Sequence, residues 1–159
     1  MLMRVLRFVR LPLVLLVIWT VLRFLLGPVF GVPYAPRGNA MVSVFGLTLI
    51  STLIYGAMSN RIGNFSWLGT LLIGLVLGLF SQILIFTATL VSYLANVNTS
   101  YFRHWDALNA PEGTVVPMAT AMTGRAVGLL VGPILIIVMA LVGRAVFGTL
   151  APRRDDAGG

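Results

Sequence analysis

The chain has 159 residues, of which 58% are hydrophobic and 9% are charged, and its mean hydropathy is +1.00. Because soluble domains carry about 25% charged residues, this composition excludes a water-soluble globular protein and indicates a polytopic membrane protein. The absence of cysteine excludes disulfides, thiolate metal sites and cysteine nucleophiles. All eleven basic residues are arginines scattered between apolar stretches, and the formal net charge is +7. This distribution predicts anchoring to anionic lipids and no binding to nucleic acid.

The N-terminal segment predicts the first membrane span. A basic region with three arginines precedes an apolar run over residues 11–27. This order resembles a secretory signal, but the run continues to Phe30 without a small-residue cleavage site, so we expect a retained signal-anchor helix. Three prolines and three glycines within residues 27–38 then predict a short loop, because they interrupt regular backbone hydrogen bonding.

Two further spans are predicted at residues 40–58 and 67–94. The first contains several serines and threonines, which can hydrogen-bond back to their own helix. The second would be about 42 Å long as a helix, longer than the roughly 30 Å hydrocarbon core, so it must tilt or protrude. Splitting residues 62–102 into a hairpin would give five spans, but no Pro, Asn or Asp interrupts the middle of that stretch.

The longest polar segment, residues 96–122, is predicted to be an outer loop and contains the only histidine and half of the acidic residues. Its aromatic residues fall on one side of a helical wheel, which predicts a short interfacial helix with rings at headgroup depth. A fourth span follows at residues 123–150, and residues 151–159 form a polar tail. The candidate residues at this end of the molecule are Arg23, Arg103, His104, Trp105, Asp106 and Glu112.

Together these segments predict an all-α integral membrane protein. It forms a single membrane domain over residues 1–159, with four transmembrane helices and a short interfacial helix in the third loop. An even number of spans places seven arginines on the side of the termini and four on the other side. The positive-inside rule then places both termini in the cytoplasm and the outer loop outside the cell membrane, as in a bacterial inner-membrane protein.

Small residues at helical spacing indicate how the helices associate. Gly124, Gly128 and Gly132 form two consecutive G-x-x-x-G units, and Gly74 and Gly78 repeat the unit in the third span. Glycines at this spacing allow two helix backbones to approach closely in lipid. The two faces can pack against each other within one chain, or the fourth span can contact another copy of the chain or a larger complex.

Few polar groups are predicted inside the membrane. Arg23 is the only charge within the otherwise apolar first span; we expect its side chain to extend to the outer headgroups, and the alternative is an ion pair with Asp106 or Glu112. Gln82 is the strongest polar group at mid-membrane depth, and we expect it to make an interhelical hydrogen bond rather than line a pore. No Asp, Glu, His or Lys lies inside a span, which disfavours an ion-coupled transporter.

The residues of an enzyme active site are weakly represented. His104 and Asp106 can act as a base with an orienting carboxylate, and Ser100 is near in sequence, so these three residues outline a hydrolytic arrangement. A metal site of His104, Asp106 and Glu112 would lack a helical ligand repeat. We therefore predict no enzymatic activity, no metal and no cofactor.

The sequence favours a small non-catalytic membrane protein that acts by helix–helix association, as an accessory or assembly subunit of a membrane complex or as a self-associating bundle. Its predicted partners are membrane lipids and other membrane proteins or further copies of the chain, and its predicted contact residues are the five glycines. The first alternative is an oligomeric channel or uncoupled transporter, lined by the serines and threonines of the second and third spans. The second is a membrane enzyme that acts on a lipid headgroup.

Overall fold

The computed structural model describes residues 1–31 and 43–149, and within these ranges it contains helices and turns but no strand. The helices are α1 (Leu2–Phe8), α2 (Arg10–Leu26), α3 (Val44–Arg61), α4 (Trp67–Leu94) and α5 (Met118–Val142), and a π-helical turn (Gly143–Phe147) extends α5. The expectation of an all-helical protein is confirmed for the described residues.

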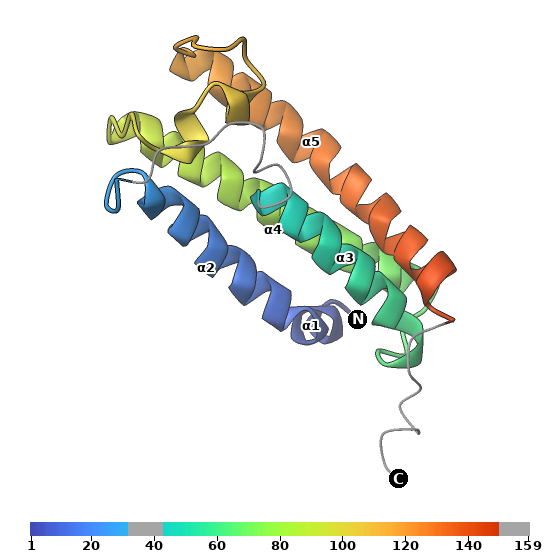
Figure 1. The fold of residues 1–159 in the computed structure, drawn as a ribbon. Helices are drawn as coiled ribbons and strands as arrows, with labels where there is room; N and C mark the ends of the chain where they lie inside the picture. The colour runs from blue at the N-terminus through green and yellow to red at the C-terminus, as the bar shows by residue number, and fades with distance from the viewer. Residues whose placement is uncertain (32–42, 150–159) are drawn as a thin grey trace.

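Helices α2 to α5 run alongside one another as a bundle, and α1 is bent from α2 by 61° at Val9 (Figure 1). The turn between α3 and α4, residues 62–66, lies at the same end as α1 and the end of α5; we call this the turn end. The loop between α4 and α5, residues 95–117, lies at the opposite end beside the end of α2; we call this the loop end.

In the described part of the chain, two helices are each long and apolar enough to cross a bilayer. One is α4, and the other is α5 with the turn that extends it to Phe147. α1 and α2 add a third span if they are counted as one broken helix. α2 has 17 residues and α3 has 18, so each is only about 26–27 Å long, shorter than a hydrocarbon core of about 30 Å. The structure is therefore compatible with a membrane location and shows two helices of spanning length.

The observed helix bounds match the predicted third span and depart from the first and fourth. α4 is one continuous helix with the predicted bounds, which excludes the hairpin alternative. α1 is a helix that is not predicted from the sequence. Its arginines interrupt the apolar residues, so the segment does not contain an apolar run. α5 begins at Met118, before the predicted residue 123; the extended backbone of Pro117 (ψ 147°) precedes the helix, and the residues that follow continue it.

α3 starts at Val44, where Ser43 caps the helix by accepting a hydrogen bond from the backbone N–H of Gly46. The predicted second span, residues 40–58, begins and ends earlier, and its first three residues lie outside the described part of the chain. The last residue of the predicted fourth span and the predicted tail, residues 151–159, also lie outside it.

The predicted interfacial helix does not form as one helix. The segment instead forms two 3₁₀ turns, Tyr101–Arg103 and Asp106–Leu108. His104 between them is extended (φ −69°, ψ 140°), and Asn109 ends the second turn in the left-handed conformation (φ 54°). Neither pair of angles is that of a right-handed helix, so no continuous helix carries the aromatic residues of the loop.

Glycines let α3, α4 and α5 approach closely in the half of the bundle near the turn end. A Cβ atom added at Gly74 would lie 2.6 Å from Ile137 Cα, and one added at Gly78 would lie 2.7 Å from Pro133 Cα, both on α5. A Cβ at Gly56 of α3 would likewise overlap the backbone of α5. The helices therefore meet backbone to backbone here, an arrangement that favours association in lipid.

The hydroxyl groups of α3 and α4 are largely satisfied within their own helices. Thr48 donates to Val44 O at 2.7 Å, and Thr89 donates to Ile85 O at 2.8 Å. Similar bonds are made by Thr52, Ser81 and Ser92. Because the hydroxyl is bonded one turn back along the helix, it can be buried in an apolar bundle.

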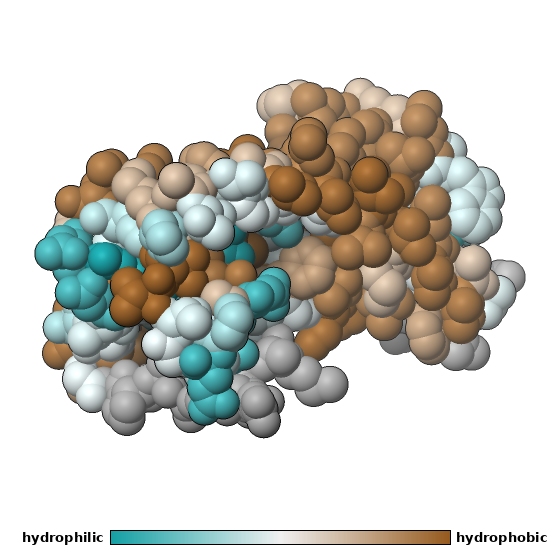
Figure 2. Space-filling model, turned by 90° about the horizontal axis from the view of Figure 1, so that it is seen from above, coloured by the Kyte–Doolittle hydropathy of each residue, from teal (hydrophilic) through white to brown (hydrophobic). Residues whose placement is uncertain are grey.

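Apolar side chains cover much of the outside of the bundle. Leu22 of α2, Ile54 of α3 and Ile83 of α4 are exposed, and Leu130 of α5 is 74% exposed. Figure 2, a view from above, shows polar residues gathered at the loop end and apolar residues over much of the remainder. An apolar surface on every long helix is expected where lipid surrounds the bundle.

Two glycine-to-alanine substitutions should differ in their effect on stability. Gly78→Ala places a Cβ against the backbone of Pro133, so α4 and α5 must separate, and we expect the free energy of unfolding in detergent to fall by about 1–3 kcal/mol. Gly124→Ala is the matched control, since a Cβ added there meets no atom within 4 Å. Thermal unfolding followed by circular dichroism measures both variants. Equal midpoints would contradict the close α4–α5 contact.

Candidate functional site

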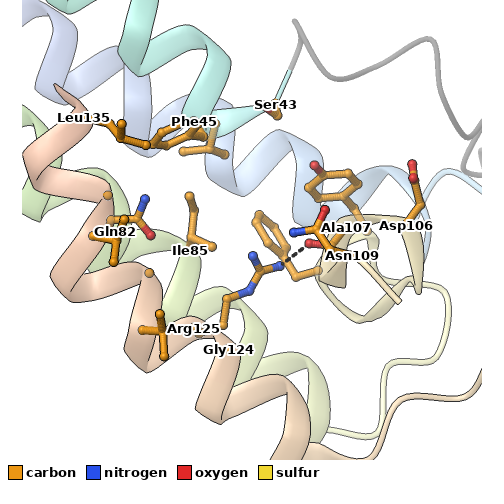
Figure 3. A pocket seen from close by; sticks show the side chains of 17 residues that line it. Ser43, Phe45, Gln82, Ile85, Asp106, Ala107, Asn109, Gly124, Arg125 and Leu135 are labelled. Atoms are coloured by element: carbon orange, nitrogen blue, oxygen red, sulfur yellow. Dashed lines mark hydrogen bonds between the residues drawn. The ribbon is translucent and has the colours of Figure 1, made fainter. Parts of the chain in front are cut away.

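A cavity of about 620 Å³ lies towards the loop end, between the start of α3, the middle of α4 and the first part of α5 (Figure 3). Residues of the α4–α5 loop form part of its wall. Its polar lining residues, among those that the structure describes, are Ser43, Gln82, Tyr101, Asp106, Asn109 and Arg125. The remaining wall is mostly apolar or glycine.

The cavity follows from the length of α3. α3 and α4 are antiparallel and joined by a short turn, and α3 has 18 residues against 28 in α4. α3 therefore extends only about 27 Å along α4, to the level of Gln82 and Ile85, which line the cavity together with Ser43. Beyond that level, in the described part of the chain, residues of the α4–α5 loop take the place beside α4 and α5 that a longer α3 would occupy.

Gln82 of α4 points its side-chain amide into the cavity (Figure 3) and is only 8% exposed. Across residues 1–31 and 43–149 the amide has no hydrogen-bond partner, so the predicted interhelical hydrogen bond is wrong. The reason is that the facing part of α5 consists of Gly128 and Gly132, which have no side chain to offer. The amide atoms are open to the cavity rather than sealed inside the protein, so a molecule in the cavity can supply their hydrogen bonds.

Gly124, Gly128 and Gly132 form one wall of the cavity. A Cβ added at Gly128 would lie 3.1 Å from Gln82 Oε1, and one at Gly132 would overlap the Gln82 amide. α4 and α5 do pack against each other, but their close contact is made through Gly74 and Gly78 of α4, nearer the turn end. The α5 glycines instead make room for Gln82 and for the cavity.

Arg125 of α5 brings a positive charge to the cavity. Its half-buried guanidinium donates from Nε to Thr89 Oγ1 at 3.1 Å and from Nη2 to Ala107 O at 3.0 Å. It forms no ion pair with a carboxylate in the described ranges. In the sequence, Arg125 is not singled out from the four arginines that are predicted on the outer side. Because α5 starts at Met118, Arg125 lies about two turns into the helix rather than at its start.

The two arginines at the loop end that the sequence predicts as candidates, Arg23 and Arg103, lie against aromatic rings. Arg23 is only 6% exposed, and its guanidinium carbon lies 4.1 Å from the centre of the Tyr101 ring. The predicted extension of Arg23 to the outer headgroups is therefore wrong, because the α4–α5 loop folds over it. Arg103 lies 4.6 Å from the centre of the Tyr93 ring and donates from Nη1 to Asn96 Oδ1 at 2.9 Å. These cation–π contacts fasten the loop to α2 and α4.

The predicted hydrolytic arrangement is not assembled. The hydroxyl of Ser100 shares a hydrogen bond of 2.7 Å with that of Ser92 in α4, so it is engaged with α4 rather than with His104. His104 Nδ1 accepts a hydrogen bond of 3.3 Å from the backbone N–H of Asp106, and the His104 ring lies 4.9 Å from that of Trp105. Burial lowers the pKa of His104 below its ordinary value, and the Asp106 charge partly opposes this shift.

The remaining acidic candidates do not form a metal site. In the part of the chain that the structure describes, no three His, Asp or Glu side chains come together closely enough to hold a metal ion. Glu112 is exposed in the α4–α5 loop. Asp106 lines the cavity, but its carboxylate is turned away from Arg125 (Figure 3). The structure therefore brings together Gln82, Arg125 and the α5 glycines, and it leaves Glu112 apart.

One largely apolar cavity is lined by the guanidinium of Arg125, the amide of Gln82 and the start of α3 at Ser43. Such a set can hold an amphiphilic molecule whose polar groups accept hydrogen bonds. Neither a protein-family model, nor a curated protein, nor a solved structure matches the chain, so its function is inferred from this cavity.

Proposed function

We propose that the chain is a four-span membrane protein that acts by association rather than by catalysis, and that the cavity between α3, α4 and α5 is its binding site. The observation that carries this proposal is the Gln82 amide, which is buried, faces the cavity and has no partner among the described residues. A buried polar group of this kind is explained when a bound molecule supplies the missing hydrogen bond.

Two belts of arginine support the four-span arrangement. At the turn end, Arg4 Nη2 donates to Gly63 O at 2.6 Å and Arg144 Nη1 donates to Phe65 O at 2.8 Å. The loop-end belt consists of Arg23, Arg103 and Arg125. Arg144 also donates to Thr70 Oγ1 and Arg125 donates to Thr89 Oγ1, and between these two threonines α4 rises about 28 Å, which is close to the roughly 30 Å of a hydrocarbon core.

The shorter helices belong in the same membrane. α2 runs between the two belts, and α3 runs from the turn end along about two-thirds of the length of α4 (Figure 1). Both expose apolar side chains on the outside of the bundle, as Leu22 and Ile54 do. We therefore assign α2 and α3 to the bilayer with α4 and α5, and the excess of arginine on the side of the termini supports a cytoplasmic position for that side.

A binding cavity of this kind suits an accessory or assembly subunit. Its occupant approaches from within the membrane, because Val127 and Val131 both line the cavity and are exposed on the outside of α5. Near the turn end, Gly74 and Gly78 bring α4 and α5 into direct contact. These contacts favour a binding site over a conducting path through one copy of the chain.

The four-span proposal specifies which side of the membrane each connection faces. The chain has no cysteine, so one introduced cysteine reports its accessibility without background. We expect Val115→Cys in the α4–α5 loop to react with a membrane-impermeant maleimide in intact cells, and Asn60→Cys near the turn end to react only after permeabilisation. Reaction of both cysteines from the same side would contradict the topology.

Filling the cavity should displace its occupant without unfolding the protein. Gly124→Leu adds a side chain where a Cβ meets open space, whereas Ala126→Leu adds similar bulk at an exposed α5 position outside the cavity lining. After gentle extraction from the native membrane, we expect mass spectrometry to detect a molecule that copurifies with the unaltered chain and with Ala126→Leu but not with Gly124→Leu. Identical sets of copurifying molecules in all three would rule out the cavity as the binding site.

A further inference from the structure

We infer that the occupant of the cavity is a glycerophospholipid with a negatively charged headgroup. Its phosphate binds Arg125, an ester carbonyl accepts a hydrogen bond from Gln82, and an acyl chain lies along α5 beside Val131. This inference rests on the proposed function and adds the chemical class of the ligand. Three features carry it, namely a cation without a carboxylate partner, a deeper hydrogen-bond donor and a wall that continues into the lipid-facing surface.

The cation selects the headgroup. A guanidinium has five N–H donors, and the contacts of Arg125 with Thr89 and Ala107 use its Nε and Nη2 and leave Nη1 for a ligand. Asp106 is the one carboxylate in the described cavity lining, and it is turned away from Arg125 (Figure 3). Neither of the Arg125 contacts neutralises its charge, so an anionic phosphate forms the strongest available bonds there.

Gln82 provides a second polar point, deeper in the bundle. It lies seven residues before Thr89, the partner of Arg125, and therefore about 10 Å farther from the loop end along α4. The positive end of the α3 helix, at Ser43, borders the same cavity. A glycerophospholipid presents polar groups in this order, with its phosphate outermost and its ester carbonyls below. A free phosphate on Arg125 would leave the Gln82 amide without a partner.

The wall of the cavity indicates that the ligand enters from the bilayer. Val127, Val131 and Leu135 line the cavity and are nevertheless 53%, 49% and 50% exposed. The cavity wall therefore continues into the outer surface of α5. Beside these residues, Gly124 and Gly128 leave space that side chains would otherwise fill. A flexible acyl chain fits such an apolar groove, and a water-soluble anion gains nothing from it.

Native mass spectrometry of the purified full chain tests this inference. Delipidated protein in detergent is titrated with phosphatidylglycerol, which is anionic, and separately with phosphatidylcholine, which is zwitterionic. We expect one bound phosphatidylglycerol per chain and weaker binding of phosphatidylcholine. Arg125→Gln should weaken phosphatidylglycerol binding by about tenfold or more, because a charge-assisted hydrogen bond is lost. Arg10→Gln, at an exposed position at the start of α2 and outside the cavity lining, should leave the affinity unchanged.

A second variant keeps the test independent of folding. Arg125→Gln also alters the contact with Thr89 and can lower stability by itself. Gln82→Met preserves an unbranched side chain and removes no hydrogen bond in the described part of the chain. We expect the delipidated variant to unfold at the same temperature or higher and to bind phosphatidylglycerol about fivefold more weakly. A purely structural role for Gln82 would instead lower the unfolding temperature of the delipidated protein.

Three results would overturn the inference. Equal binding of the two lipids, insensitive to both Arg125→Gln and Gln82→Met, would mean that lipid adheres only to the outer surface. Competition by inorganic phosphate would mean that the ligand is a free anion. Release of a protein rather than a lipid by Gly124→Leu would assign the cavity to a protein partner; the proposed function would then stand while the lipid assignment failed.

Discussion

A hydrogen-bonding group inside a membrane must find its partner in the protein or in a bound molecule, because hydrocarbon supplies none. Hydroxyl groups of α3 and α4 meet this requirement locally, as Thr48 and Thr89 do by bonding to carbonyls of their own helices. Arginines at the two ends of the bundle contact backbone carbonyls and aromatic rings of the protein. For example, the guanidinium carbon of Arg144 lies 4.5 Å from the centre of the Trp67 ring. Gln82 is buried without such a partner in the described chain, and it faces the cavity.

The cavity and the tight half of the bundle have a common origin in the unequal lengths of the helices. Near the turn end, α3, α4 and α5 meet through glycines such as Gly56 and Gly78. Counted from the turn end, α3 covers about two-thirds of the length of α4, and the two longer helices continue past it. On α5, Gly124 and Gly128 add to the space that the short helix leaves. The cavity therefore lies where the bundle is least complete.

Caps and apolar runs in the sequence predict part of the fold, but they do not predict the cavity. α4 has its predicted bounds because a serine cap precedes an unbroken apolar run. α1 could not be predicted in this way, because its arginine side chains depend on a tertiary contact, as between Arg4 and Gly63. The glycine spacing was visible in the sequence, but the residue that faces each glycine was not. Gly78 faces Pro133 whereas Gly128 faces Gln82, and that difference depends on the register between α4 and α5.

A structure of the full chain in lipid nanodiscs that contain phosphatidylglycerol, resolved well enough to show side chains, tests the ligand site most directly. We predict a phosphate beside Arg125, an acyl chain that passes Gly128, and an ester oxygen within hydrogen-bond distance of Gln82 Nε2. A cavity filled by side chains of the protein itself, or a hydrogen bond between Gln82 and another part of the chain, would contradict this prediction.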